Sequence, residues 1–163
     1  MHKTRMQKIQ VIAAAIAVFV LLLPMKSAAQ TSEPKEKAEI RAVIDEQVAA
    51  WNNGDIETFM KSYEDSPETT FVGATSVNKG YAKVLERYKK NYATHAQMGS
   101  LSFSELDVRL LPSTSEKTEY ALVTGRFHLE RTEHGTAGKD EGIFSLVFHR
   151  TAAGWKIVLD HTS

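Results

Sequence analysis

The C-terminal half of the chain places an arginine and two histidines where they could do chemistry. In TEYALVTGRFHLER, strand alternation puts Arg126 and His128 on one face. A guanidinium can anchor a polar or anionic ligand group, and an imidazole can transfer protons near neutral pH. On the last predicted strand, alternation sends Asp160 and His161 to opposite faces, so only one of them can face a pocket. His128 and His161 are therefore the candidate acid–base residues, and Arg126 is the candidate anchor.

Each of these residues also has a structural interpretation. Arg126 could form a surface ion pair with Glu119 or Glu130, because an arginine is costly to bury without a partner. His128 could be a hydrogen-bonded wall residue, and His161 could satisfy a hydrogen bond at the sheet end or in a dimer contact. The residues alone leave these alternatives open.

Metal and cofactor chemistry have no motif in this sequence. There is no cysteine, and the six histidines lack the spacing of a preformed metal site. A nucleophile elbow, a phosphate loop and a dinucleotide fingerprint are likewise absent from the sequence. We therefore expect no metal and no cofactor.

The first 29 residues are predicted to be a signal peptide. Basic residues precede an apolar run of 13 residues, Val11 to Leu23, and the small residues Ser27 to Ala29 follow Pro24. A bilayer span needs about 20 apolar residues, so cleavage is favoured over a permanent anchor. The mature protein is expected in the periplasm or outside the cell.

Removal of this segment changes the charge balance. The signal carries four of the 20 basic residues and no acid, which leaves 16 basic against 20 acidic residues, a formal charge of −4. That charge does not suit a nucleic-acid partner. The basic run of Arg87, Lys89 and Lys90 is predicted to be the solvated face of a helix. Residues 30–36 are predicted to form a polar linker before a single domain, 37–163.

Helices are predicted before strands. Apolar spacing favours helices over 37–53, from Asp55 to Tyr63, and over 80–92, with a short strand at 69–72. Longer strands are predicted at 101–111, 118–131, 141–151 and 155–162, separated by polar turns, as in an antiparallel meander. The order indicates an α+β fold in which helices cover one face of a curved sheet.

Two segments resemble the nuclear-transport-factor-2-like superfamily. VAAWNNGDIETFMKSYED is similar to its opening helix, Asn-Gly-Asp turn and second helix, and HRTAAGWKIVLDHTS is similar to its closing hairpin. The ending is especially similar to SnoaL-like proteins related to the calcium/calmodulin-dependent kinase II association domain. The resemblance covers about residues 37–163 and implies a cone, a cystatin-like roll of curved antiparallel sheet around the helices, with a pocket at its open end. It also implies a homodimer through the outer sheet face.

Family mechanisms fit this chain only in part. The oxyanion tyrosine of ketosteroid isomerase falls at or near Gln47, and its base falls near Val72 or Gly73, where no carboxylate stands. The resemblance to the association domain puts Arg126 in the cavity, but Leu146 replaces a second arginine, which implies weaker anion binding. In limonene epoxide hydrolase an Arg-x-Asp pair acts on a strand, and His128 replaces that carboxylate.

The resulting hypothesis is an exported protein that binds a small, partly apolar organic molecule, with or without cofactor-free isomerase, lyase or hydrolase activity. Arg126 would anchor the ligand, with Trp51, Tyr63, Tyr88 and Phe144 around the pocket. The alternative is a non-catalytic dimerisation or carrier module.

Overall fold

A computed structural model describes residues 29–114, 118–133 and 136–163. The predicted signal peptide lies outside the described residues except for Ala29. Helix α1 runs from Ala29 to Asn52, so it includes the segment 30–36 that we predicted to be a polar linker. Among the described residues, no helix combines the length and apolarity needed to cross a membrane.

The first two helices follow the predicted pattern. Ile40, Ile44 and Trp51 of α1 are buried, as their helical spacing requires. Gly54 takes a φ of +75° just after the helix, a conformation that glycine adopts at little cost. The Asp55 carboxylate then accepts a hydrogen bond of 2.9 Å from the Thr58 backbone N–H and caps α2, Ile56–Met60.

Two further helices follow the short hairpin of β1, Thr70–Val72, and β2, Val77–Lys79. Helix α3, Tyr81–Asn91, lies where the sequence predicted it and buries Val84 and Tyr88. The four-residue helix α4, His95–Met98, was not predicted, because one turn is too short to show periodicity.

Four long strands form the antiparallel meander that the sequence predicted. They are β3, Ser100–Leu110; β4, Tyr120–Glu133; β5, Thr136–Thr151; and β6, Gly154–Thr162. The sheet order is β2-β1-β6-β5-β4-β3, and β1 pairs with β6 in parallel. The α+β prediction is therefore confirmed, with a mixed sheet of six strands.

The β4–β5 hairpin is longer than predicted. Residues 132–139 were expected to form a polar connection, yet Thr132 pairs with Ala137 in the ladder. Cross-strand ion pairs join Glu130 to Lys139 and Arg131 to Asp140, each at 2.6 Å. Hydrophobic alternation does not detect a ladder whose side-chain pairs are charged.

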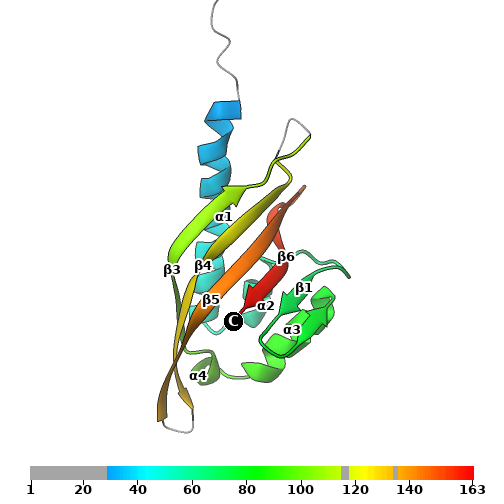
Figure 1. The fold of residues 1–163 in the computed structure, drawn as a ribbon. Helices are drawn as coiled ribbons and strands as arrows, with labels where there is room; N and C mark the ends of the chain where they lie inside the picture. Colours follow the sequence, from blue (N-terminus) through cyan, green and yellow to red (C-terminus); the bar gives the residue numbers. More distant parts are fainter. Residues whose placement is uncertain (1–28, 115–117, 134–135) are drawn as a thin grey trace, which may run out of the picture.

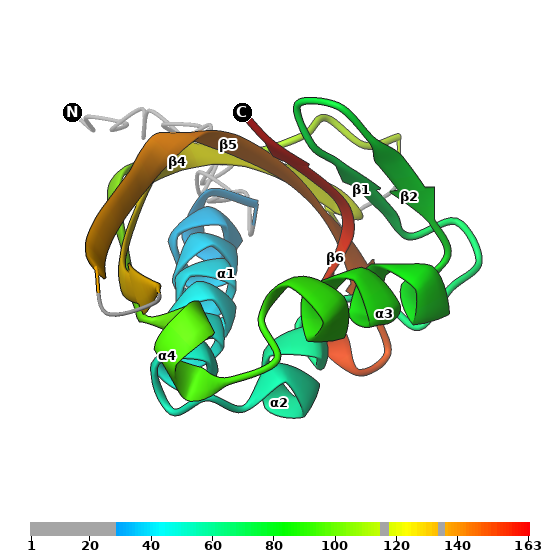
Figure 2. The ribbon, with the colours of Figure 1, turned by 90° about the horizontal axis from the view of Figure 1, so that it is seen from below.

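The sheet curves around α1, as Figure 2 shows, and α2, α3 and α4 lie along its open side. Figure 1 shows the β4–β5 hairpin extending past the rest of the sheet toward α4. There Gly99, at φ +66°, lies against the backbone of Glu130, where any side chain would clash. The concave face and the helices enclose the core, whose most deeply buried side chains include Ile40, Ile44, Met60, Val84, Val123, Phe148 and Ile157.

Candidate functional site

A cavity of about 560 Å³ lies between the concave face of the sheet and helices α1 and α3. Its size falls in the usual range for sites that bind small organic molecules. The wall is mainly aromatic: Phe59, Tyr88 and Tyr92 pack edge-on against Trp51, with ring centroids 4.7 to 6.1 Å apart. The other apolar or aromatic lining residues are Tyr63, Phe71, Leu101, Phe103, Phe127, Leu129, Phe144 and Leu146.

A bulge in β6 turns Asp160 into this cavity. The register with β5 shifts between Val147, which pairs with Leu159, and Phe148, which pairs with Ile157, so Val158 is the extra residue. A bulge of this kind exchanges the faces of the residues that follow it. Asp160 therefore lies opposite the cavity residue Leu146, with only 5% of its surface exposed.

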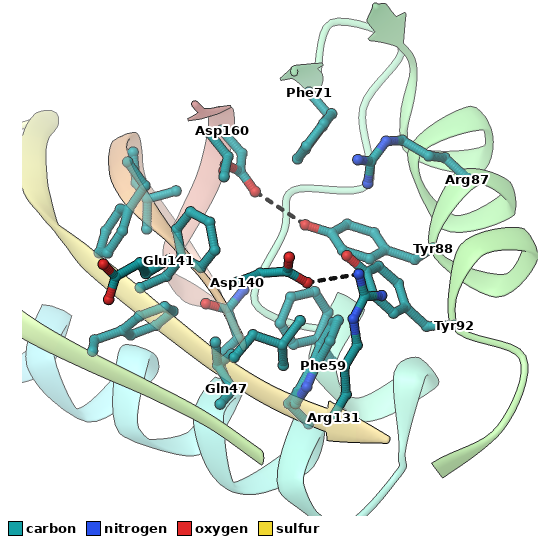
Figure 3. Close-up of a pocket in the computed structure, with 18 of the residues that line it drawn as sticks. Gln47, Phe59, Phe71, Arg87, Tyr88, Tyr92, Arg131, Asp140, Glu141 and Asp160 are labelled. Atoms are coloured by element: carbon teal, nitrogen blue, oxygen red, sulfur yellow. Dashed lines mark hydrogen bonds and ion pairs between the residues drawn. The ribbon is translucent and has the colours of Figure 1, made fainter. Parts of the chain in front are cut away.

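Three hydroxyl groups hold the Asp160 carboxyl. Tyr63 donates to Oδ2 at 2.6 Å and Tyr88 donates to the same oxygen at 3.1 Å, while Thr162 donates to Oδ1 at 3.0 Å. The two tyrosine hydroxyls are also 3.1 Å from each other. Figure 3 shows Asp160 and Tyr88 meeting across the cavity. We call Asp160, Tyr63 and Tyr88 the buried hydroxyl–carboxyl cluster.

The surroundings of this cluster favour its neutral forms. Burial raises the pKa of Asp160, and the hydrogen bonds from Tyr63, Thr162 and Tyr88 offset that effect only in part. Burial and the Asp160 charge together raise the pKa of Tyr63 and of Tyr88 well above the ordinary tyrosine value. Both tyrosines therefore stay protonated as donors, and Asp160 is a stronger base than an exposed carboxylate.

Gln47 brings an amide to the same cavity from α1. The residue is 3% exposed, lines the cavity, and makes no side-chain hydrogen bond within the described residues. By contrast, the Trp51 indole N–H donates to the Met98 carbonyl at 2.9 Å and is not free for a ligand. An amide without a partner at a buried position is a candidate ligand contact, since buried polar groups usually find a hydrogen-bond partner.

Two arginines line the cavity on the α3 side. The Arg87 guanidinium carbon lies 3.6 Å from the Phe71 ring centroid, a cation–π geometry, and Figure 3 shows the side chain reaching inward from α3. Arg131, on the β4–β5 hairpin, forms an ion pair of 2.6 Å with Asp140, also drawn in Figure 3. The prediction that Arg87 belongs to a solvated helix face is therefore wrong.

Of the seven residues predicted for the site, four line the cavity: Trp51, Tyr63, Tyr88 and Phe144. Phe144 lies across Gly125, where any side chain would collide with its ring. The other three, Arg126, His128 and His161, are not lining residues, so the structure does not bring the predicted anchor and acid–base residues together with the aromatic wall.

The prediction that Arg126 faces the pocket is wrong because β4 presents its odd-numbered residues, such as Phe127 and Leu129, to the cavity. Arg126 points outward, half exposed, and its Nε donates to Glu105 at 3.1 Å. This is close to the surface ion pair considered from the sequence, although the partner is a different glutamate.

The two histidines lie on the convex face. The His128 Nε2 is 2.8 Å from the Ser104 hydroxyl, and its Nδ1 is 3.5 Å from Glu141. His161 lies opposite Ser145, whose neighbours in β5 line the cavity from the other face. Their prediction as acid–base residues of the pocket is wrong in placement, and of Asp160 and His161 it is Asp160 that faces inward.

Among the polar cavity residues that the sequence did not identify, Asp160, Gln47 and Arg87 each had a weak signal. Ile157, Val158 and Leu159 form an unbroken apolar run, which breaks strict alternation and is compatible with a bulge before Asp160. Gln47 falls three residues after Ile44 on the buried stripe of α1, and Arg87 falls three residues after buried Val84 on α3. Within the described residues, no group of three or more potential ligands is placed to hold a metal ion.

Comparison with known proteins identifies the family of the chain and structures with a similar fold. The sequence profile described as a SnoaL-like domain matches residues 40–163. A nuclear-transport-factor-2-like protein of unknown function from Shewanella oneidensis is 26% identical, with a TM-score of 0.67 over 78% of this chain and 98% of that one. No curated protein matches the sequence significantly.

Two more distant structures share the fold. A Xanthomonas campestris protein described as a candidate calcium/calmodulin-dependent protein kinase II association domain has 18% identity and a TM-score of 0.62, over 77% of this chain and 84% of that one. A ketosteroid isomerase-like protein from Erwinia carotovora has 19% identity and a TM-score of 0.58, over 79% and 95%. The resemblance to the nuclear-transport-factor-2-like superfamily is confirmed.

Proposed function

The chain belongs to the SnoaL-like domain family, and we propose that it binds a small, partly apolar organic molecule in the cavity of the concave face. The observation that carries this proposal is the aromatic cavity of about 560 Å³ that also contains the buried hydroxyl–carboxyl cluster. Apolar walls supply affinity through burial, and a few converging polar groups set the orientation of the ligand. A cavity with both features is suited to a ligand with an apolar body and a hydrogen-bonding oxygen.

The polar groups of the cavity support cofactor-free proton transfer as its catalytic form. Asp160 can take a proton from a carbon next to a carbonyl group, and Tyr63 or Tyr88 would turn its single O–H from Asp160 to the oxygen that becomes negative. This assigns the acid–base role to Asp160 in place of His128 and His161. The reaction class would be that of an isomerase or a lyase.

A non-catalytic carrier or dimerisation module is the second candidate. It is favoured by the position of His128 and His161, neither of which lines the cavity. We propose a homodimer in either case, formed through the convex face. Its support is the exposed Ile143, with 55% of its surface accessible, on the same face of β5 as the half-buried Val147, which pairs with Leu122. Native mass spectrometry would give the subunit number and the mass of any retained ligand.

Export with cleavage of the signal peptide is the third part of the proposal. It rests on the N-terminal sequence pattern alone, and it places the mature protein in the periplasm or outside the cell. N-terminal sequencing of protein from its own cells should find Gln30 as the first residue. A chain that still begins at Met1 would contradict export with cleavage.

Ligand binding can be tested with the neutral probe N-phenyl-1-naphthylamine, whose fluorescence increases in apolar surroundings. We expect saturable binding that Leu146→Trp abolishes, because the larger side chain fills the cavity. Val147→Trp, on the opposite face of the same strand, is the matched control and should bind as the unmodified protein does. Loss of binding in both variants, with unchanged circular dichroism, would contradict the proposed site.

A further inference from the structure

Arg87 brings a guanidinium to the cavity without a direct ion-pair partner among the described residues. Its guanidinium lies over Phe71 and 5.3 Å from the Tyr88 ring centroid, half-buried among aromatic rings. Within the described residues it has neither a hydrogen bond nor an ion pair. Placing a charged group among apolar side chains is costly unless an opposite charge approaches it.

The acids around the cavity are engaged elsewhere. Asp140 is paired with Arg131 at 2.6 Å, and Glu141 lies near His128. Asp160 is held by three hydroxyl groups and makes no direct ion pair with Arg87, although the Arg87 charge acts to lower the pKa of Asp160. The cavity thus offers a guanidinium with no carboxylate in direct contact, and it does so from helix α3 instead of from the strand positions that family resemblance indicated.

Neutral donors line the same cavity. The Gln47 amide has no hydrogen-bond partner among the described residues, and Tyr92, four residues after Tyr88 on the α3 side, is also a lining residue. In Figure 3, Arg87, Tyr88 and Tyr92 stand on one side of the cavity and Gln47 on the wall that α1 contributes. A carboxylate between them would find charge and hydrogen-bond donors, while an attached ring would contact the aromatic wall.

We infer that the ligand is a small organic acid, with an aromatic or branched apolar body and a carboxylate that pairs with Arg87. This inference rests on the proposed function and specifies the class of ligand. A guanidinium forms a charge-assisted pair with a carboxylate that it cannot form with a carboxamide of the same shape. Acid and amide of matched shape should therefore differ strongly in affinity.

The test compares phenylacetate with phenylacetamide by isothermal titration calorimetry at pH 7. We expect the protein to bind phenylacetate about tenfold or more tightly than the amide. Arg87→Gln should remove this preference, and Arg87→Lys should restore part of it because the charge is kept. Lys90→Gln removes an equal charge from the exposed surface of α3 and should leave the preference unchanged.

Equal binding of the two compounds, or an acid preference that survives in Arg87→Gln, would overturn the inference and leave the proposed function intact. If neither phenyl compound binds while N-phenyl-1-naphthylamine does, the inference is likewise overturned and the proposed function stands. Failure of the neutral naphthylamine probe as well would instead overturn the proposed function.

Discussion

On the convex face of the sheet, Arg126 pairs with Glu105 in solvent, whereas on the concave face Asp160 is buried and held by hydroxyl groups. The two residues lie on β4 and β6 of one sheet, and burial raises the pKa of Asp160. Solvent screens an exposed ion pair and weakens it, whereas burial strengthens each hydrogen bond to a carboxyl group and makes its loss costly. A charged residue therefore indicates a candidate ligand site when it is buried on the concave face, but not when it is paired in solvent on the convex face.

The largest expected difference between the faces concerns packing. Phe148→Ala removes a side chain with no exposed surface and should lower the free energy of unfolding by about 3–5 kcal/mol. Ile143→Ala, on the convex face, should cost less than about 0.5 kcal/mol in dilute protein. Urea denaturation measures both. A cost for Ile143→Ala that grows with protein concentration would indicate a dimer through the convex face.

A smaller effect is expected from the hydroxyl groups that hold Asp160. Tyr63→Phe removes the shortest of the three hydrogen bonds and should cost about 1–3 kcal/mol, since the buried carboxyl loses a donor. Tyr81→Phe, which changes a more exposed phenol on α3, is the control and should cost far less. Equal costs for the two variants would break the distinction between the cluster and an ordinary surface tyrosine.

The charge of Asp160 should appear in the pH dependence of stability. Its folded pKa is raised above the ordinary value of 3.8, so the folded protein binds the proton more tightly than the unfolded chain does. This residue's contribution therefore falls as pH rises from about 4 to beyond the folded pKa, and then stays constant. Asp160→Asn removes that dependence while it can still accept from the tyrosines.

The measurement is the stability of Asp160→Asn relative to the unmodified protein between pH 4 and pH 8. We expect the difference to shift in favour of the variant as pH rises. A shift in favour of the unmodified protein would mean that Asp160 is held as a stabilised carboxylate.

The smallest effect belongs to the convex ion pair. Arg126→Gln should change the free energy of unfolding by at most about 0.5 kcal/mol, because both partners are largely exposed. It should also leave binding of N-phenyl-1-naphthylamine unchanged. Weakened probe binding in this variant, measured by fluorescence titration, would return Arg126 to the site and contradict the assignment of faces.

The sequence was sufficient for the fold and for part of the wall. Helical spacing located α1 and α3, and turn chemistry separated the strands of the meander. Trp51 and Tyr88 were identified because they are large aromatic residues on the buried face of a helix, and that face lines the cavity. These features depend on local period and composition, which a single sequence contains.

The polar part of the site depends on geometry that a single sequence encodes poorly. The orientation of Asp160 depends on one extra residue at Val158, and a slip of one residue reverses every face beyond it. The position of Arg87 depends on how α3 packs against the hairpin that contains Phe71. The resemblance to the association domain assigned Arg126 to the cavity, although the apolar residues Val123, Phe127 and Leu129 alternate on the opposite face of β4.

The claim on which everything else depends is that ligands bind on the concave face. Two-dimensional ¹H–¹⁵N NMR of the labelled protein, titrated with N-phenyl-1-naphthylamine, tests it directly. We expect the amide shifts to concentrate around Tyr63, Tyr88 and Asp160 as the probe saturates. Shifts confined to the convex face around Arg126, Ile143 and His161, or no shifts at all, would contradict it.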